Sequence, residues 1–144
     1  MSIFTNRDRR IEELRRVGLF ADLPTKDLQL LDRHVTPTKV AAGTVLAREG
    51  RAPQQFVLIV EGTASVKVGD RVVATLGPGD SVGELSLLDR GAQSATVATE
   101  EECALLAVAA NEFQAMLEES PGFSRNLLQS MARRLRAMDE LVTT

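Results

Sequence analysis

The stretch that decides the fold is Gly83-Glu84-Leu85-Ser86-Leu87-Leu88, followed after a short segment by Gln93-Ser94-Ala95-Thr96-Val97. The glycine at its start lets backbone N–H groups approach an anion, because no Cβ is in the way. The residues after it can begin a short helix whose N-terminal amides point toward that anion. Glu84 can accept hydrogen bonds from sugar hydroxyls. The stretch therefore has the layout of a cradle for a sugar phosphate.

Short segments rich in Val, Ile and Thr lie on both sides of this stretch, with glycines between them. Such segments with tight turns predict an antiparallel sandwich or barrel. Gly69-Asp70 is expected to form the turn of a hairpin. The expected strands cover residues 35–40, 44–48, 56–61, 64–68, 71–76, 94–99 and 104–108.

Helices are expected at both ends of the chain. An amphipathic pattern predicts one helix over residues 7–18 and a second short helix that runs to Leu31. Asn111 is a candidate N-cap for a third helix over residues 112–118. Pro121 then begins a long helix that runs to about Leu141. Together with the strands, this predicts a mainly β, α+β fold, an antiparallel jelly-roll barrel with helices before and after it.

The 144 residues are expected to form one domain, since a chain of this length can bury a real core and shows no internal repeat or flexible linker. We expect N-terminal helices in residues 1–33, the barrel in 34–109 and C-terminal helices in 110–144.

The composition excludes several classes of function. A single cysteine, Cys103, allows no intrachain disulfide, and a single histidine, His34, is too few for a cupin-type metal site. No Ser/His/Asp or Cys/His constellation can be assembled without this one residue. We expect His34 to be a surface or boundary residue. The chain has no Trp or Tyr, so it lacks the aromatic platform on which single-stranded nucleic acid usually stacks. Binding of single-stranded nucleic acid is therefore not expected. The N-terminus has no apolar signal segment and no apolar run is long enough for a membrane span, which favours a soluble cytoplasmic protein.

In family order, the GELSLL run, the QSATV strand, the preceding β segments and the following MARRL helix resemble a cyclic nucleotide-binding domain, with residues 83–95 as its phosphate-binding cassette. The resemblance covers nearly the whole chain and includes the catabolite activator class and the regulatory subunits of cAMP-dependent kinase. It implies a non-enzymatic sensor module that binds cAMP or cGMP, with no metal or other cofactor, and relays occupancy through the C-terminal helix.

The resemblance also implies roles for residues of the cassette. Glu84 would accept a hydrogen bond from the ribose 2′-hydroxyl. The cyclic phosphate would be surrounded by main-chain amides, those of Gly83, Leu85, Ser86 and either Ser94 or Ala95.

Gln93 departs from the family pattern, which has an arginine at this position that pairs with the phosphate. A glutamine amide offers only neutral donors, and losing a charge-assisted contact costs about 1.5–3 kcal/mol, so we expect weak binding. Arg90, on the variable segment of the cassette, is an alternative source of charge, although a solvated loop arginine is the simpler interpretation.

The C-terminal helix carries an apolar stripe with 3-4-3-4 spacing, which suits a coiled-coil seam and resembles a dimerisation helix. We therefore expect a homodimer. Its members are Leu128, Met131, Leu135, Met138 and Val142.

The family places a Thr-Ser pair that contacts the base shortly after its A-R-R-L run, whereas this chain has Met138 and Asp139 there. Arg134, Met138 and Asp139 complete the candidate ligand-binding residues. The departures at these positions and at Gln93 favour an alternative, a degenerate fold that dimerises or binds a protein partner without a nucleotide. No residues follow Thr144 to form a helix-turn-helix, so direct DNA binding by this chain is not expected.

Overall fold

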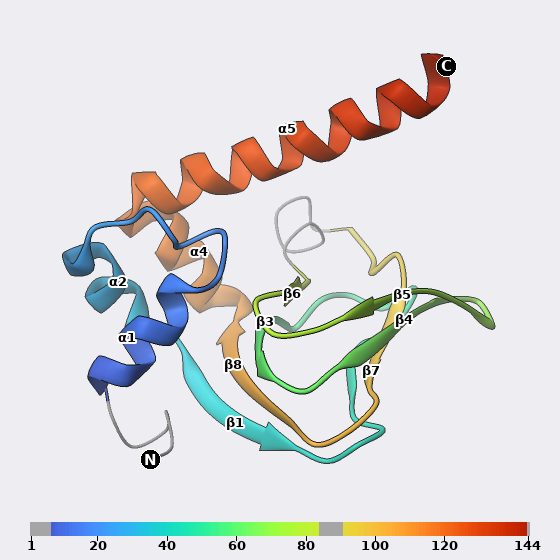
Figure 1. Cartoon of the computed structure of the whole chain (residues 1–144), viewed down its shortest axis with the longest axis horizontal. Helices are drawn as coiled ribbons and strands as arrows, with labels where there is room; N and C mark the ends of the chain where they lie inside the picture. The colour runs from blue at the N-terminus through green and yellow to red at the C-terminus, as the bar shows by residue number, and fades with distance from the viewer. Residues whose placement is uncertain (1–6, 84–90, 144) are drawn as a thin grey trace.

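The computed structural model describes residues 7–83 and 91–143 and contains two four-stranded antiparallel sheets with flanking helices (Figure 1). The predicted fold class is confirmed. In the first sheet the order is β1 (Thr36–Val40), β8 (Cys103–Ala109), β3 (Gln55–Glu61) and β6 (Ser81–Val82). In the second sheet the order is β2 (Val45–Ala47), β7 (Thr96–Thr99), β4 (Ala64–Val68) and β5 (Arg71–Leu76).

Strand β3 lies at the centre of the molecule because both of its faces are buried. Phe56 and Leu58 pack against the helices, whereas Val57 and Ile59 pack against residues of the second sheet. A strand covered on both sides has no polar face, which explains why its sequence is a continuous apolar run. The two sheets and the helices thus form successive layers with two apolar clusters between them.

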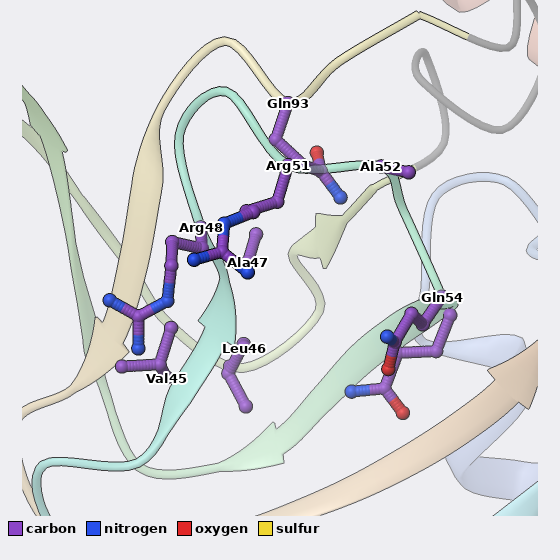
Figure 2. A pocket seen from close by; sticks show the side chains of 9 residues that line it. Val45, Leu46, Ala47, Arg48, Arg51, Ala52, Gln54 and Gln93 are labelled. Atoms are coloured by element: carbon purple, nitrogen blue, oxygen red, sulfur yellow. The ribbon is translucent and has the colours of Figure 1, made fainter.

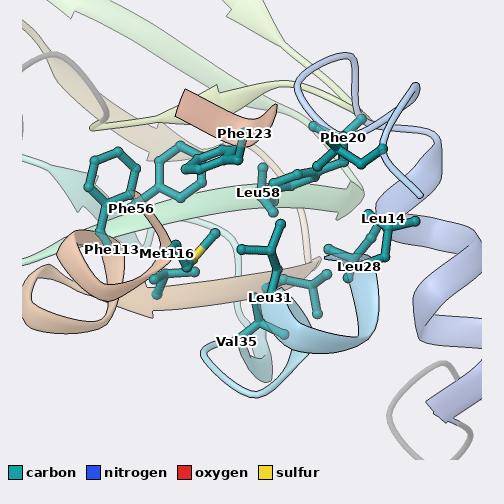
Figure 3. Close-up of a cluster of buried hydrophobic side chains, with 14 of the residues drawn as sticks. Leu14, Phe20, Leu28, Leu31, Val35, Phe56, Leu58, Phe113, Met116 and Phe123 are labelled. Atoms are coloured by element: carbon teal, nitrogen blue, oxygen red, sulfur yellow. The ribbon is translucent and has the colours of Figure 1, made fainter. Parts of the chain in front are cut away.

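The helices are α1 (Arg7–Arg15), α2 (Thr25–Asp32), α4 (Ala110–Glu119) and α5 (Pro121–Thr143). Helices α1, α2 and α4 lie together beside the first sheet, and the C-terminal half of α5 extends away from them (Figure 1). Four phenylalanines dominate the cluster under these helices (Figure 3). The ring of Phe123 stacks on Phe20 with centroids 5.2 Å apart and meets the edge of Phe113 at 6.0 Å. The start of α5 is therefore part of the core. Within residues 7–83 and 91–143, no helix has the length and apolar character needed to cross a bilayer.

An ion pair between Arg10 and the buried Asp32 holds α1 against α2. The guanidinium of Arg10 donates two hydrogen bonds to the Asp32 carboxylate, with N–O distances of 2.5 and 2.7 Å. Asp32 is almost fully buried, so this forked pairing offsets the cost of removing its charge from water.

The hairpin turn at Gly69-Asp70 is confirmed, and so is the helix break at Ser120-Pro121, where the Ser120 hydroxyl accepts a hydrogen bond from the Phe123 amide at 3.1 Å.

The prediction that Asn111 caps α4 is wrong, because this helix begins at Ala110 directly after β8. Its first amide donates to the Gln54 carbonyl at 3.2 Å, so a backbone acceptor replaces a capping side chain. Strand β6 was not predicted because two residues give no periodicity.

His34 is a boundary residue, one of the two expected environments, and 13% of its side chain is exposed. Its ring lies between two carboxylates of α4: Nδ1 contacts Glu112, and Nε2 lies 2.7 Å from Oε2 of Glu119. Burial alone lowers the pKa of His34, but hydrogen bonds to Glu119 and Glu112 and the charges of both carboxylates outweigh burial, so its pKa is raised. The protonated ring therefore ties the start of β1 to α4.

Stability should consequently fall as pH rises past the pKa of folded His34. Because this pKa lies above the unfolded value of about 6.5, the ion pairs contribute fully below about pH 6.5 and are lost as the ring deprotonates. Urea unfolding of the wild type and of His34→Gln should show a difference in unfolding free energy that is largest in acid and shrinks toward alkaline pH. A difference that is independent of pH would contradict this assignment.

Candidate functional site

The cassette begins at a backbone position that only glycine fits. Gly83 has φ +99°, and a Cβ at this residue would lie 2.6 Å from the carbonyl oxygen of Gln55. A larger residue would have to displace the main chain of β3. The close approach thus sets the start of the cassette against the beginning of β3. The candidate residues Glu84, Leu85, Ser86 and Arg90 lie outside the described residues.

The other end of the cassette is joined to the connection between β2 and β3. The Gln93 amide donates to the Arg51 carbonyl, and the Gly50 amide donates to the Gln93 carbonyl, both at 2.9 Å. No acceptor among the described residues takes a hydrogen bond from the amides of Ser94 or Ala95. Ser94 is exposed and Ala95 is half-buried. The main chain here is held in place at Gln93, and the two N–H groups that follow have no acceptor within the described residues.

A cavity of about 450 Å³ lies next to this segment (Figure 2). The described residues that line it come from β2, from the β2–β3 connection, from the start of β3 and from Gln93. Its polar lining includes Arg48, Arg51 and Gln54, and Val45 and Ala47 contribute an apolar side. This volume falls in the range of small-molecule sites, about 300–1,000 Å³. The arrangement can hold an anionic organic molecule.

Of the three candidates on α5, only Asp139 has a described side chain. Asp139 is exposed and is not among the described lining residues. Arg134 and Met138 belong to α5, but their side chains lie outside the described part of the molecule. Among the candidate residues that can be placed, Gly83 approaches Gln55 and Gln93 lines the cavity beside Gln55. Ser94 and Ala95 follow Gln93 directly, and Asp139 lies on α5.

The first half of helix α5 is anchored to the core. The side-chain amide of Asn126 donates to the Leu19 carbonyl at 2.8 Å and to Oδ1 of Asp22 at 2.7 Å, while Phe123 and Leu127 are buried. After Met131, the helical residues whose side chains are described are all exposed. The first half of α5 is therefore fixed to the core, and the second half is exposed wherever its side chains are described.

Arg48 and Arg51 line the cavity, although no pattern in the sequence points to them. Arginines on either side of a glycine turn are ordinary surface residues in a sequence. The missing information is the pairing of residues 50 and 51 with residue 93, a contact between segments far apart in the chain.

Comparisons with known proteins agree with this geometry. The family described as "Cyclic nucleotide-binding domain" matches residues 37–120, more than half of the chain. The Pycsar effector protein XpPycTIR of Xanthomonas perforans is 35% identical over 103 residues, which are 71% of this chain and 34% of that protein. A cyclic nucleotide-gated potassium channel of Rhizobium etli is 34% identical over 118 residues, 82% of this chain and 33% of the channel.

Among solved structures, the Thermus thermophilus catabolite activator protein superposes with a TM-score of 0.79 at 30% identity, covering 88% of this chain and 62% of that one. The chain spans about a third of the length of the two curated relatives described above. The family match extends from β1 through β8 to the end of α4, and therefore includes both sheets and the cassette. The chain belongs to the cyclic nucleotide-binding domain family.

Proposed function

We propose that this chain is a non-enzymatic regulatory module that binds cAMP or cGMP weakly at residues 83–95. Domains of this family are regulatory and not catalytic. The observation that carries the proposal is the held segment at Gln93, whose neighbours Ser94 and Ala95 keep their amides unpaired within the described structure. A domain without an anionic ligand has no evident need for such a nest of amides beside a cavity.

Titration calorimetry with cAMP and with cGMP on the wild type and on Glu84→Ala tests the proposal. Weak binding to the wild type that Glu84→Ala abolishes is the expected result, because Glu84 would hold the ribose hydroxyl. An exposed carboxylate elsewhere, in Glu118→Ala, provides the matched control and should leave the heat of binding unchanged. Equal affinities for the wild type and Glu84→Ala would contradict this site.

We further propose that occupancy is relayed through the second half of α5. Asn126 and Phe123 fix the first half of this helix, whereas the described side chains after Met131 are exposed, as in a segment that can change position. A ligand that bound better when this half covers the cavity would shift the population toward that position. The relay would then alter how α5 contacts another molecule.

A second candidate function is a dimerisation or protein-interaction module, and the surface of α5 favours it. Leu128 and Leu135 are 65% and 63% exposed and lie seven residues apart, hence on one face of the helix. Met131, between them, packs on the core. Two large apolar side chains in water on one helix face are typical of a surface that another helix covers.

If α5 pairs with its counterpart in a second copy, the wild type should sediment as a homodimer, and Leu135→Glu should sediment as a monomer. The carboxylate would be buried in the seam without a partner. The matched control is Gln129→Glu, which adds the same charge at another exposed position of α5. Analytical ultracentrifugation over a concentration series makes the measurement, and a monomeric wild type would rule out this dimer.

A further inference from the structure

The β2–β3 connection places two arginines beside Gln93. Arg48 and Arg51 both line the cavity, and together with Gln93 they lie on one side of it, across from Gln54 (Figure 2). The hydrogen bonds that Gln93 makes with Gly50 and Arg51 tie the two segments at one point. The Arg51 side chain therefore starts from the residue that is paired with Gln93, so the two side chains are neighbours.

Neither arginine has an acidic partner in the part of the chain that the structure describes. Both side chains are exposed, and no described carboxylate lies within ion-pair distance of either. Their neighbour in sequence, Glu49, is engaged elsewhere, because its Oε1 accepts a hydrogen bond from the Gly69 amide at 2.9 Å. Two guanidinium groups on one wall of a cavity repel each other and attract an anion.

The positive charge on this side of the cavity is local, because the chain as a whole carries a net charge of −3. Guanidinium groups have a planar set of donors that matches phosphate oxygens, and they stay charged at any physiological pH. Gln93 carries no charge, but the Arg51 side chain lies beside it and lines the same cavity.

We propose that Arg51, with Arg48 beside it, supplies the positive charge that holds the phosphate of the ligand, in place of the arginine that the family pattern has at position 93. The proposal rests on the proposed function for the identity of the ligand, a cyclic nucleotide. It explains how a cassette with Gln93 keeps an anion site, since the charge is contributed from the β2–β3 connection. Arg51 is the primary residue because its own main chain pairs with Gln93.

Calorimetry with cAMP on Arg51→Gln, Arg51→Lys and Arg33→Gln tests this role. Arg51→Gln should weaken binding by about 10-fold or more, since a charge-assisted contact is lost, and Arg51→Lys should retain part of the affinity. Arg33→Gln removes the same charge at an exposed position at the end of α2 and should bind like the wild type. Urea unfolding of each variant verifies that the fold is intact.

A double-mutant cycle with Gln93→Arg sharpens the result. If Arg51 already pairs with the phosphate, Gln93→Arg should gain more affinity in the Arg51→Gln background than in the wild type. Equal gains in both backgrounds, or an Arg51→Gln affinity equal to that of Arg33→Gln, would overturn the role of Arg51 and leave the proposed function standing.

Inorganic phosphate is the second probe, because it requires no nucleotide site. In NMR spectra of the wild type, phosphate should shift the side-chain Nε–Hε signal of Arg51, and a sulfate titration should do the same. If the wild type binds neither cyclic nucleotide, the proposed function fails. A phosphate-induced shift would then still support an anion site at Arg51, and no shift would overturn it.

Discussion

Gln93→Arg should bind cAMP about 10- to 100-fold more tightly than the wild type, the largest gain in affinity that a single substitution at this site is expected to give. The added guanidinium would lie beside the cavity and donate charge-assisted hydrogen bonds to the cyclic phosphate. Titration calorimetry at constant ionic strength measures the effect, and the enhancement should shrink as salt is added.

The same substitution has an expected cost without ligand. Three arginines would then line one cavity, and their mutual repulsion should lower the melting temperature of the free Gln93→Arg protein, with cAMP restoring it. Gln93→Lys is the matched variant, with the same charge but no planar fork, and should gain less. An affinity of Gln93→Arg that equals the wild type would show that the phosphate does not approach residue 93.

Phe123→Ala should give the largest loss of stability, about 3–5 kcal/mol, which is a large part of the 5–15 kcal/mol typical of a domain. The Phe123 ring is fully buried and contacts both Phe20 and Phe113, so its removal leaves a cavity between α5, α4 and the segment after α1 (Figure 3). Urea unfolding at equilibrium gives the change directly from the midpoint and the slope.

Leu128→Ala is the control for this prediction, because it also truncates an apolar side chain on α5 but at an exposed position. Its effect should stay within about 0.5 kcal/mol. A loss below about 1 kcal/mol for Phe123→Ala would mean that α5 is not anchored through this ring, and the proposed relay would lose its fixed point.

The strands and helices could be predicted because their signals are local. Glycine turns separate the strands, and the hairpin at Gly69-Asp70 and the break at Ser120-Pro121 have their own turn and capping chemistry. The prediction that Asn111 caps α4 was wrong because Asn is only statistically preferred at N-cap positions. Here the first amide of α4 donates instead to the carbonyl of Gln54, which is distant in sequence.

The site was only partly predictable. Gly83 and Gln93 could be identified because they belong to a sequence motif with a fixed spacing. The physical reason for a glycine at residue 83 is the nearby Gln55 carbonyl, and only the folded chain brings the two together. Arg51 and His34 had no local signal at all. Their partners, Gln93 for the first and Glu112 and Glu119 for the second, come from segments far along the chain, so their environments depend on tertiary structure.

We propose that main-chain amides at residues 83, 94 and 95 receive a cyclic nucleotide, while the Gln93 amide stays paired with the Arg51 carbonyl. A titration of ¹⁵N-labelled protein with cAMP, followed by two-dimensional NMR, tests it most directly because every amide reports separately. We predict saturable shifts that are largest for Gly83, Ser94 and Ala95, with smaller shifts in α5, the proposed relay. Signals that stay unmoved at millimolar cAMP and cGMP, or shifts confined to the α1–α2 face, would contradict it.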